Sequence, residues 1–193
     1  MGQSQLRIAG WCIVISLILG GFNSVAFAAD KKEQERQEIR KMAQQTLSSL
    51  YKAQPSAKNA IENAKGYAVF SNFGMKIFLA GGGSGSGIAV NRATKQDTFM
   101  KMAEVQAGLG MGIKKFRIVF VFETGPAFNN FVNQGWEFGG QATAAAKAEG
   151  KGGELAGAIA VSPGIWMYQL TETGLAAEIT AKGTKYYKDS SLN

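Results

Sequence analysis

Residues 108–122, which read GLGMGIKKFRIVFVF, decide the fold of this chain. Glycine occupies every second position from Gly108 to Gly112, and side chains in a β-strand alternate between the two faces of the sheet. Such a strand leaves one face bare, so that a large side chain or another backbone lies close against it. Glycine clusters recur at residues 81–87 and 139–140. We therefore expect a β-domain with close backbone packing.

The second half of this stretch predicts a central strand. The predicted strand 117–122 is apolar on both faces, which is typical of a strand that is covered on both sides. We expect residues 81–87 to be a hairpin turn, because they lack the lysine and the following helix that a nucleotide-binding loop requires. Further segments have strand character and are separated by turn residues. These predicted strands are residues 67–70, 77–80, 87–91, 98–103, 105–113, 141–146, 159–161, 165–170 and 175–181.

Apolar residues three or four positions apart predict helices before the sheet. Residues 30–52 carry one apolar stripe, and Pro55 ends the pattern. A second short helix follows, with Ile61 and several alanines on one face and Gly66 just after its end. Residues 127–132 predict a short internal helix. The expected fold is α+β, a predominantly antiparallel, glycine-rich β-sheet domain with N-terminal helices and one short internal helix.

The first 29 residues have the features of an export signal peptide. Arg7 gives the positive start, and residues 8–19 are apolar but too few for a comfortable membrane span. An uncleaved anchor is the alternative, which the glycine and polar residues after residue 19 disfavour. We expect cleavage near Ala28 or Ala29 and a periplasmic or secreted protein. The expected domains are 1–29 (cleavable signal peptide), 30–64 (N-terminal helical segment) and 65–193 (β-rich domain).

The composition limits the chemistry that we expect of this chain. It has one cysteine, Cys12, which lies inside the expected signal peptide, and it has no histidine. The exported chain is thus expected to have no disulfide, thiol nucleophile or cysteine-based metal site. Its carboxylates are scattered, so we expect no enzyme activity, no cofactor and no metal; a hydrolase that uses Glu104 and Glu123 is the alternative. The net charge of +7 favours an anionic partner.

Two clusters of cations and aromatic residues are the candidate lipid-binding sites. Cations would bind headgroup phosphates while an aromatic side chain enters the membrane interface. The first cluster is expected to be a turn between two strands. Alternatively, either cluster is a solvated segment whose lysines protect the sheet from edge pairing. The candidate residues are Lys114, Lys115, Phe116 and Arg117 in the first cluster, and Lys182, Lys185, Tyr186 and Lys188 in the second.

The helix expected at residues 30–52 is open to two interpretations. Its polar face carries cations, so it either lies on a membrane or packs across the β-domain. Three glutamates dilute the positive charge of this face, which favours packing. They are Glu33, Glu35 and Glu38.

Several short motifs, in this order, resemble the SYLF domain family, which is also called the Ysc84 actin-binding or DUF500 domain. Together they span about residues 56–188, and their order and spacing are more specific than any one of them. The motifs are AKGYAVF at 64–70, GGGSGSG at 81–87, GLGMG at 108–112, the short helix at 126–132, TGLAAE at 173–178 and KGT at 182–184.

This resemblance implies a lipid-binding domain. Eukaryotic members of the family bind phosphoinositide membranes, some fungal members bind actin, and exported bacterial members are described as lipid-binding. This chain departs from the family at Ser84 and Ser86, where other members carry arginine or lysine, and at Ala177 or Glu178, where a glycine is expected. We expect an exported, non-enzymatic protein that binds anionic phospholipid headgroups at a membrane surface. The alternative is a structural or protein-interaction module of the cell envelope with a protein partner; no nucleic-acid partner is expected.

Overall fold

A computed structural model gives the backbone of most of the chain. It describes residues 9–77, 80–107, 112–138, 155–172, 174–175 and 183–193. Side chains are described over residues 29–71, 82–104, 116–138, 155–172, 174–175 and 183–193. The chain divides into two compact units, Met1–Glu38 and Ile39–Asn193.

The first unit contains the beginning of helix α1 (Ala9–Ala53). Its side chains interact one helical turn apart: Arg36 forms an ion pair with Glu33 (3.1 Å), and the side-chain amide of Gln34 donates to Asp30 (3.3 Å). In the part of the chain that the structure describes, no helix has both the length and the apolar character needed to cross a membrane. The signal peptide expected at residues 1–29 stays a prediction.

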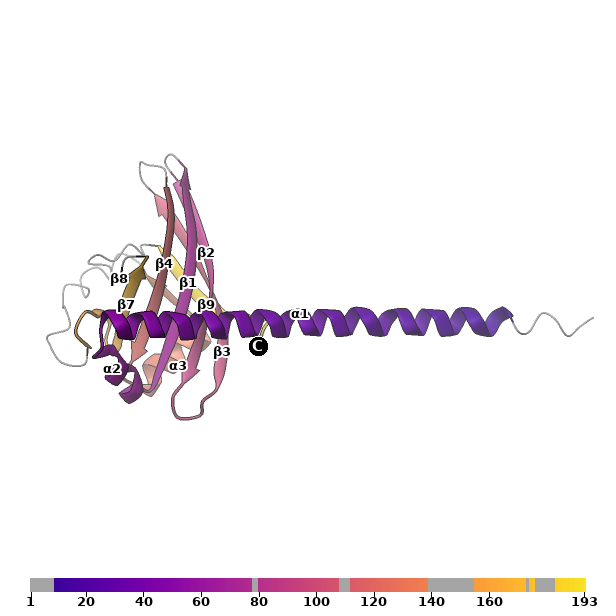
Figure 1. Cartoon of the computed structure of the whole chain (residues 1–193), viewed down its shortest axis with the longest axis horizontal. Helices are drawn as coiled ribbons and strands as arrows, with labels where there is room; N and C mark the ends of the chain where they lie inside the picture. Colours follow the sequence, from indigo (N-terminus) through magenta and orange to yellow (C-terminus); the bar gives the residue numbers. More distant parts are fainter. Residues whose placement is uncertain (1–8, 78–79, 108–111, 139–154, 173, 176–182) are drawn as a thin grey trace, which may run out of the picture. The chain divides into compact units, whose positions relative to one another are not determined.

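The second unit is built on one antiparallel sheet, whose nine described strands follow the spatial order β5-β9-β3-β2-β1-β4-β7-β6, with β8 paired to β7 (Figure 1). The strand predicted to be central is β4, which lies between β1 and β7. Its residues 118–122 are all buried. The strands are β1 Gly66–Ile77, β2 Ala80–Asn91, β3 Asp97–Ala107, β4 Gly112–Phe122, β5 Trp136–Phe138, β6 Ile159–Ser162, β7 Ile165–Thr171, β8 Gly174–Leu175 and β9 Thr184–Lys188.

The glycine cluster at 81–87 is strand, and the prediction of a hairpin turn there is wrong. β1 and β2 pair without interruption from Gly66↔Asn91 to Ile77↔Ala80. The strand predicted at 67–70 therefore extends to Ile77, and the separate strand predicted at 77–80 is wrong, because Ile77 ends β1 and Ala80 begins β2. The reason is that glycine at every second position keeps one face of β2 bare. A Cβ on Gly87 would meet the Phe70 ring and the Val69 carbonyl oxygen. A side chain at position 87 would therefore push Phe70 out of its place in the core.

Other predicted strands have mixed outcomes. The strands predicted at 159–161 and 165–170 are confirmed as β6 and β7. β3 continues to Ala107 and so includes both the strand predicted at 98–103 and the start of the one predicted at 105–113, whose last two residues open β4. The separate strand predicted at 105–113 is therefore wrong. The glycine-rich residues 108–111, the strand predicted at 141–146 and most of the one at 175–181 lie outside the described residues. β5 and β9 had not been predicted.

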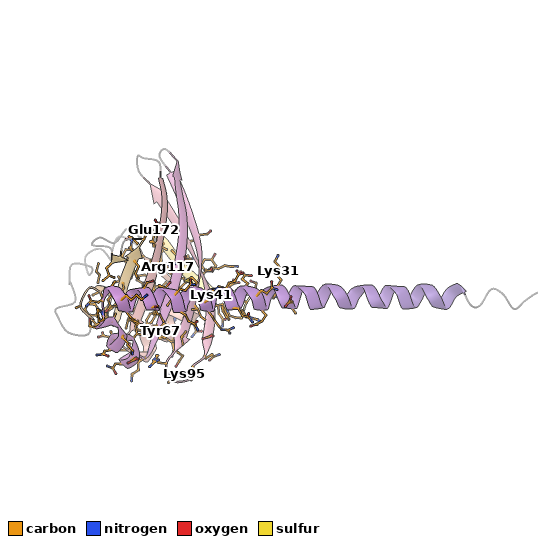
Figure 2. All side chains as sticks on the ribbon, viewed as in Figure 1. Lys31, Lys41, Tyr67, Lys95, Arg117 and Glu172 are labelled. Atoms are coloured by element: carbon orange, nitrogen blue, oxygen red, sulfur yellow. The ribbon has the colours of Figure 1, made fainter. Side chains whose placement is uncertain are left out.

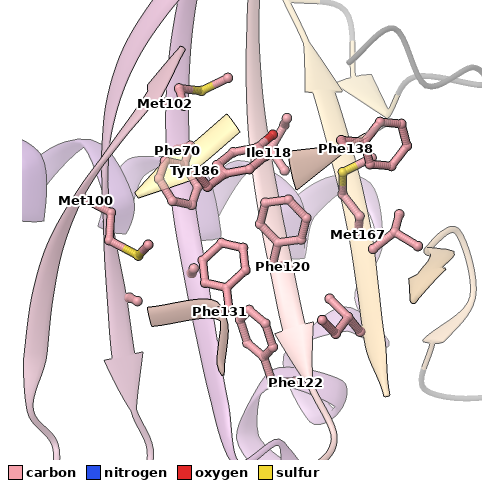
Figure 3. Packing of buried hydrophobic residues seen from close by; sticks show 14 of the residues in the cluster. Phe70, Met100, Met102, Ile118, Phe120, Phe122, Phe131, Phe138, Met167 and Tyr186 are labelled. Atoms are coloured by element: carbon pink, nitrogen blue, oxygen red, sulfur yellow. The ribbon is translucent and has the colours of Figure 1, made fainter. Parts of the chain in front are cut away.

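An aromatic core fills the inner face of the sheet (Figure 3). The Tyr186 ring of β9 lies 4.8 Å from the ring of Phe70 and 5.0 Å from that of Phe120, measured between centroids. Phe120 belongs to β4, from which three strands separate β9 in the sheet order. The sheet is therefore curled, because strands distant in its order share one core. Helix α3 (Gly125–Gln134) adds Phe131 to this core, 5.2 Å from Phe120.

The outer face of the sheet is covered by the second half of α1 and by α2 (Ala57–Asn63). Ile39, Ala43 and Leu50 of α1 are buried there together with Val69 and Val119 of the sheet. This confirms the apolar stripe predicted in residues 30–52 and the preference for packing over a membrane-surface role. The expected α+β fold, a mainly antiparallel sheet with N-terminal helices and one internal helix, is confirmed.

The two short helices begin and end for local reasons. Thr124 caps α3, accepting a hydrogen bond from the Ala127 amide at 3.3 Å. The prediction that Gly66 follows the end of α2 as its left-handed cap residue is wrong, since Ala64 is already extended and Gly66 opens β1. Gly66 is required for another reason, which is that a Cβ at this position would overlap the Phe128 ring of α3.

Candidate functional site

The first predicted cluster lies in the middle of a strand. Lys114 and Lys115 are within β4, and their side chains lie outside the described ones. Phe116 is buried in the inner core and Arg117 is half-buried. The predicted turn is wrong, because β4 keeps its pairing with β1 through all four residues, Lys114 opposite Gly74. Phe116 is therefore held in the protein core in this structure.

The second predicted cluster is divided between core and surface. Lys185 and Lys188 are exposed on β9, Tyr186 is fully buried in the core, and Lys182 lies outside the described residues. Tyr187 is 39% exposed, and among the described residues it is the large hydrophobic side chain that is exposed. We call Lys101, Lys185, Tyr187 and Lys188 the β9 surface; Lys101 lies opposite Tyr187 in the ladder.

The positive charge of the β9 surface is partly compensated. The exposed Glu137 of β5 lies directly opposite Lys185. Lys101 forms an ion pair with Asp189 (3.0 Å between Nζ and Oδ2). Lys188 is thus the only cation of this surface for which the described residues show no facing carboxylate.

Asp189 anchors the segment that follows β9. Its carboxylate is 3% exposed and accepts hydrogen bonds from the Ser191 amide (2.9 Å) and hydroxyl (2.6 Å). Burial acts to raise the pKa of Asp189, but these bonds and Lys101 outweigh it and hold the pKa below its ordinary value. The Asn193 side chain bonds to both the amide and the carbonyl of Phe99, as a neighbouring strand would (3.0 and 2.8 Å).

Replacing Asp189 with asparagine should lower the free energy of unfolding by about 2 kcal/mol at neutral pH, since hydrogen bonds to a buried charge are lost. The Lys101–Asp189 ion pair contributes little to this free energy, because the Lys101 side chain is 43% exposed and solvent screens the pair. A carboxyl group whose pKa is lower in the folded protein than in the unfolded chain stabilises the fold at pH values above its unfolded-state pKa. This stabilisation is lost as the pH falls through the folded-state pKa. The difference between wild type and D189N, measured by urea unfolding, should stay constant above about pH 5 and shrink below pH 4. A difference unchanged at pH 3 would contradict this account.

A second basic surface lies at the end of the sheet next to α2. Gly66, the first residue of β1, pairs with Asn91, the last residue of β2. Lys65 and Arg92 flank this pair and therefore meet, and the Arg92 amide donates to the Lys65 carbonyl at 3.1 Å. We call the four cations at this end, which come from α2, the segment before β1 and the β2–β3 turn, the basic end. They are Lys58, Lys65, Arg92 and Lys95.

The positive charge of the basic end is partly compensated. Lys58, Lys65 and Lys95 are exposed, and Glu62 is the acidic residue of α2. Asp97, just past the turn, is engaged by Arg40 at 2.8 Å. In Figure 2, Lys95 and Tyr67 are labelled toward the end of the sheet where α2 lies. Two exposed carboxylates lie at this end: Glu62 is on α2, and Glu123 follows β4 opposite Lys65, so the four cations leave a net positive charge.

The turn that carries Arg92 and Lys95 is rigidly built. The Asn91 side chain accepts hydrogen bonds from the amides of Ala93 (2.9 Å) and Thr94 (3.1 Å). Lys95 has φ of +58°, and its amide donates to the Asn91 carbonyl at 2.9 Å. These bonds hold the backbone of the turn, and with it the Cα atoms that carry the Arg92 and Lys95 side chains.

Arg92 is hydrogen-bonded to α2, and its charge acts on two tyrosine hydroxyl groups. Its Nη2 donates to the Glu62 carbonyl (3.1 Å), which belongs to the last turn of the helix. Burial raises the pKa of Tyr67, an effect that the Arg92 charge partly offsets. Burial likewise raises the pKa of Tyr51, and the Tyr67 and Glu62 charges add to the effect. Both phenols are therefore protonated donors at neutral pH.

Sequence reasoning missed the basic end because its cations are far apart in the chain. Lys65 was noted only as part of the motif at 64–70, and Arg92 and Lys95 follow a strand with no aromatic neighbour to mark them. The register of β1 and β2 is the signal that would have found them. In the register that pairs Ile77 with Ala80, residues 65 and 92 are direct neighbours. Drawing the turn at 81–87 hides this.

The described residues contain no group of three or more histidine, cysteine, aspartate or glutamate side chains that could hold a metal ion. Glu104, one residue of the hydrolase alternative, is buried on the inner face of β3. Burial, together with the Glu104 charge, raises the pKa of Tyr186. Glu123, the other residue, is exposed at the end of β4.

Comparison with known proteins gives two matches. Residues 103–193 match the family model Ysc84, described as "Las17-binding protein actin regulator". The chain is also 36% identical over 154 residues to Beta cell expansion factor A of Aeromonas veronii. This alignment covers 80% of the chain but 57% of that protein, so the chain spans a little over half the length of its relative.

Proposed function

Since this chain belongs to the Ysc84 (SYLF) family, we propose that it is a non-enzymatic binding module that attaches to anionic phospholipid surfaces through its basic end. The single observation that carries this proposal is that four cations lie at one end of the sheet and outnumber the exposed carboxylates of Glu62 and Glu123; the cations are Lys58, Lys65, Arg92 and Lys95. We further propose that the protein is exported and meets these lipids in the cell envelope or outside it.

Electrostatics gives the expected strength. A lysine or arginine near an anionic membrane surface contributes about 1 kcal/mol of binding free energy, and salt screens this attraction within a Debye length of about 10 Å. The four cations together support a reversible attachment that weakens as salt is added. Such binding needs no helix that spans the membrane.

Vesicle flotation tests the proposal. Wild-type protein should float with phosphatidylglycerol vesicles at low salt and remain below phosphatidylcholine vesicles. The variant K58Q/K65Q/K95N removes three exposed cations, and asparagine tolerates the positive φ at residue 95. Its affinity for the anionic vesicles should fall by about 100-fold, at about 1 kcal/mol per cation.

The matched control removes the cations predicted from the sequence. The variant K185Q/K188Q takes two exposed charges from the β9 surface, and its affinity should fall by less than about tenfold. If K185Q/K188Q lost binding and the basic-end variant kept it, the β9 surface would be the site and this proposal would be wrong. Pelleting with actin filaments without any affinity for anionic vesicles would instead favour a protein partner.

A further inference from the structure

A groove of about 460 Å³ runs along one side of the second half of α1. The described residues that line it are three or four positions apart, so they share one side of the helix over about two turns, or about 12 Å. They are Gln44, Leu47, Ser48, Tyr51 and Lys52. The groove is open to solvent, its surface is mainly apolar, and none of these residues belongs to the basic end or to the β9 surface.

The groove offers both apolar contact and hydrogen-bonding groups. Leu47 and Tyr51 are half-buried and pack against the cluster that α1 forms with the outer face of the sheet. Gln44 and Ser48 are exposed, and their amide and hydroxyl groups donate and accept hydrogen bonds. A peptide segment carries partners for both kinds of group. An acyl chain has nothing that bonds to the amide or the hydroxyl group.

The shape of the groove favours an elongated ligand. Pockets of this volume that hold a small molecule usually enclose about 70–90% of its surface, which an open groove does not. A second helix, in contrast, can lay its apolar side along such a groove with anchoring side chains three or four residues apart. Leu47 and Tyr51 are four positions apart and therefore match that spacing.

The charge at the groove is positive. Lys52 lines it and is exposed, and residues 39–61 contain no aspartate or glutamate. Glu62 is the next acidic residue along the chain. Burial raises the pKa of Tyr51, and the charges of Glu62 and Arg92 act on this hydroxyl in opposite directions. Lys52 thus sets the sign of the charge that a ligand meets, and an acidic ligand complements it.

We propose that this groove binds an acidic amphipathic helix of a protein partner. The apolar side chains of the partner lie on Leu47 and Tyr51, and one of its carboxylates pairs with Lys52. The α1 helix therefore has two roles, since it covers the outer face of the sheet and offers its flank to the partner. This interaction is independent of the membrane function proposed for the basic end.

A labelled probe peptide and the full chain test this by fluorescence anisotropy. The probe is an alanine-based helix with leucines three and four residues apart on one side and glutamates beside them. Wild type should bind it saturably, with a Kd in the micromolar range that rises as salt is added. The same peptide with lysine in place of glutamate should bind at least about tenfold more weakly. Equal binding of both peptides, or no saturation by the glutamate peptide, would overturn the proposal.

Two adjacent serines provide a matched pair of variants. Ser48 lines the groove and Ser49 does not, although both are exposed. Ser48→Tyr places a bulky side chain in the groove without a change in the core, so its affinity for the probe should fall at least about tenfold. Ser49→Tyr should bind as wild type does. If both variants bound the probe as tightly as wild type, the groove would not be the site.

Two exposed lysines of α1 separate a local charge contact from general attraction. Lys52→Gln removes the cation of the groove and should lower the affinity about threefold. Lys41, labelled on α1 in Figure 2, lies about 16 Å away along the helix axis, which exceeds the Debye length of about 10 Å at 0.1 M salt. Lys41→Gln should therefore have little effect at that salt concentration. Equal losses from both variants would refute a contact with Lys52.

Flotation on phosphatidylglycerol vesicles separates the groove from the membrane function. The S48Y variant should float as wild type does, because Ser48 lies outside the basic end. If S48Y lost flotation and kept its affinity for the probe, the groove would belong to a membrane surface and this inference would be wrong. If K58Q/K65Q/K95N lost the probe while S48Y kept it, the peptide would bind at the basic end, which would also refute the groove.

Discussion

Replacing Gly87 with alanine should lower the free energy of unfolding by about 3 kcal/mol, the upper end of the usual cost of overpacking a core. The added Cβ would meet the Phe70 ring and the Val69 carbonyl oxygen. Phe70 cannot turn aside, because its ring is enclosed by Tyr186, Phe120 and Phe131. The Val69 carbonyl belongs to β1, between β2 and β4, and its movement would disturb both ladders.

The same strand provides a matched control. A Cβ on Gly82 would have the Glu104 carbonyl oxygen at 3.5 Å as its neighbour, an ordinary contact. Gly82→Ala should therefore be neutral or stabilising by up to about 1 kcal/mol, because alanine restricts the unfolded chain. Urea denaturation of both variants measures the contrast. If both substitutions had similar small effects, the bare inner face of β2 would not be a packing requirement.

Truncating Tyr186 to alanine should cost about 4 kcal/mol, the usual range for removing a large aromatic side chain from a core. Its ring contacts Phe70, Phe120 and Phe131, and it joins β9 to strands on the far side of the curled sheet. Without the Tyr186 ring, β9 loses these contacts with Phe70 of β1 and Phe120 of β4. Thermal unfolding monitored by circular dichroism would show the loss as a large drop in Tm.

Two further variants separate the causes of this effect. Tyr187 is the next residue on β9 and is 39% exposed, so Tyr187→Ala should change stability by no more than about 0.5 kcal/mol. The Tyr186 hydroxyl is buried with no hydrogen-bond partner among the described residues. Tyr186→Phe should therefore be neutral or slightly stabilising, because it removes an unsatisfied polar group. A loss on Tyr186→Phe as large as that on Tyr186→Ala would contradict this reasoning.

The elements that the sequence predicted well carry long periodic signals. The stripe from Ile39 to Leu50 repeats over several turns, and a helix with such a stripe has to bury it against another element. The apolar strand β4 was equally clear, since only a strand covered on both sides is apolar on both faces. The sequence also predicted helix α3, from Pro126 and from the inward-facing aromatic residues that follow it.

The errors have one physical cause, which is that glycine and lysine act both as turn residues and as strand residues. Glycine at 81–87 was interpreted by its local preference for turns, whereas packing against Phe70 requires it in β2. Lys114 and Lys115 were interpreted as a turn because charge interrupts an apolar run. Pairing with β1 extends β4 through them. Long-range pairing decided both segments, and a local pattern contains no information on it.

The candidate site depended on the same register. Lys65 and Arg92 meet because β1 and β2 pair continuously from Ile77↔Ala80 to Gly66↔Asn91. The candidate clusters chosen from the sequence consist of consecutive residues. Because side chains alternate between the two faces of a strand, such clusters are divided between core and surface. Tyr186 and Lys185 show this directly, since one is buried and its neighbour is exposed.

The central claim is that the basic end, and no other surface, meets anionic lipid. Ala93 is exposed in the turn between Arg92 and Lys95, and its side chain is a single methyl group. A polarity-sensitive fluorophore attached after Ala93→Cys, with Cys12→Ser to remove the native thiol, reports directly on this turn. Tyr187→Cys in the same background reports on the β9 surface.

On mixing with phosphatidylglycerol vesicles at low salt, the fluorophore at residue 93 should shift to the blue, and phosphatidylcholine vesicles should have no effect. The fluorophore at residue 187 should change little with either. A blue shift at residue 187 with none at residue 93, in protein that floats with the anionic vesicles, would contradict the account.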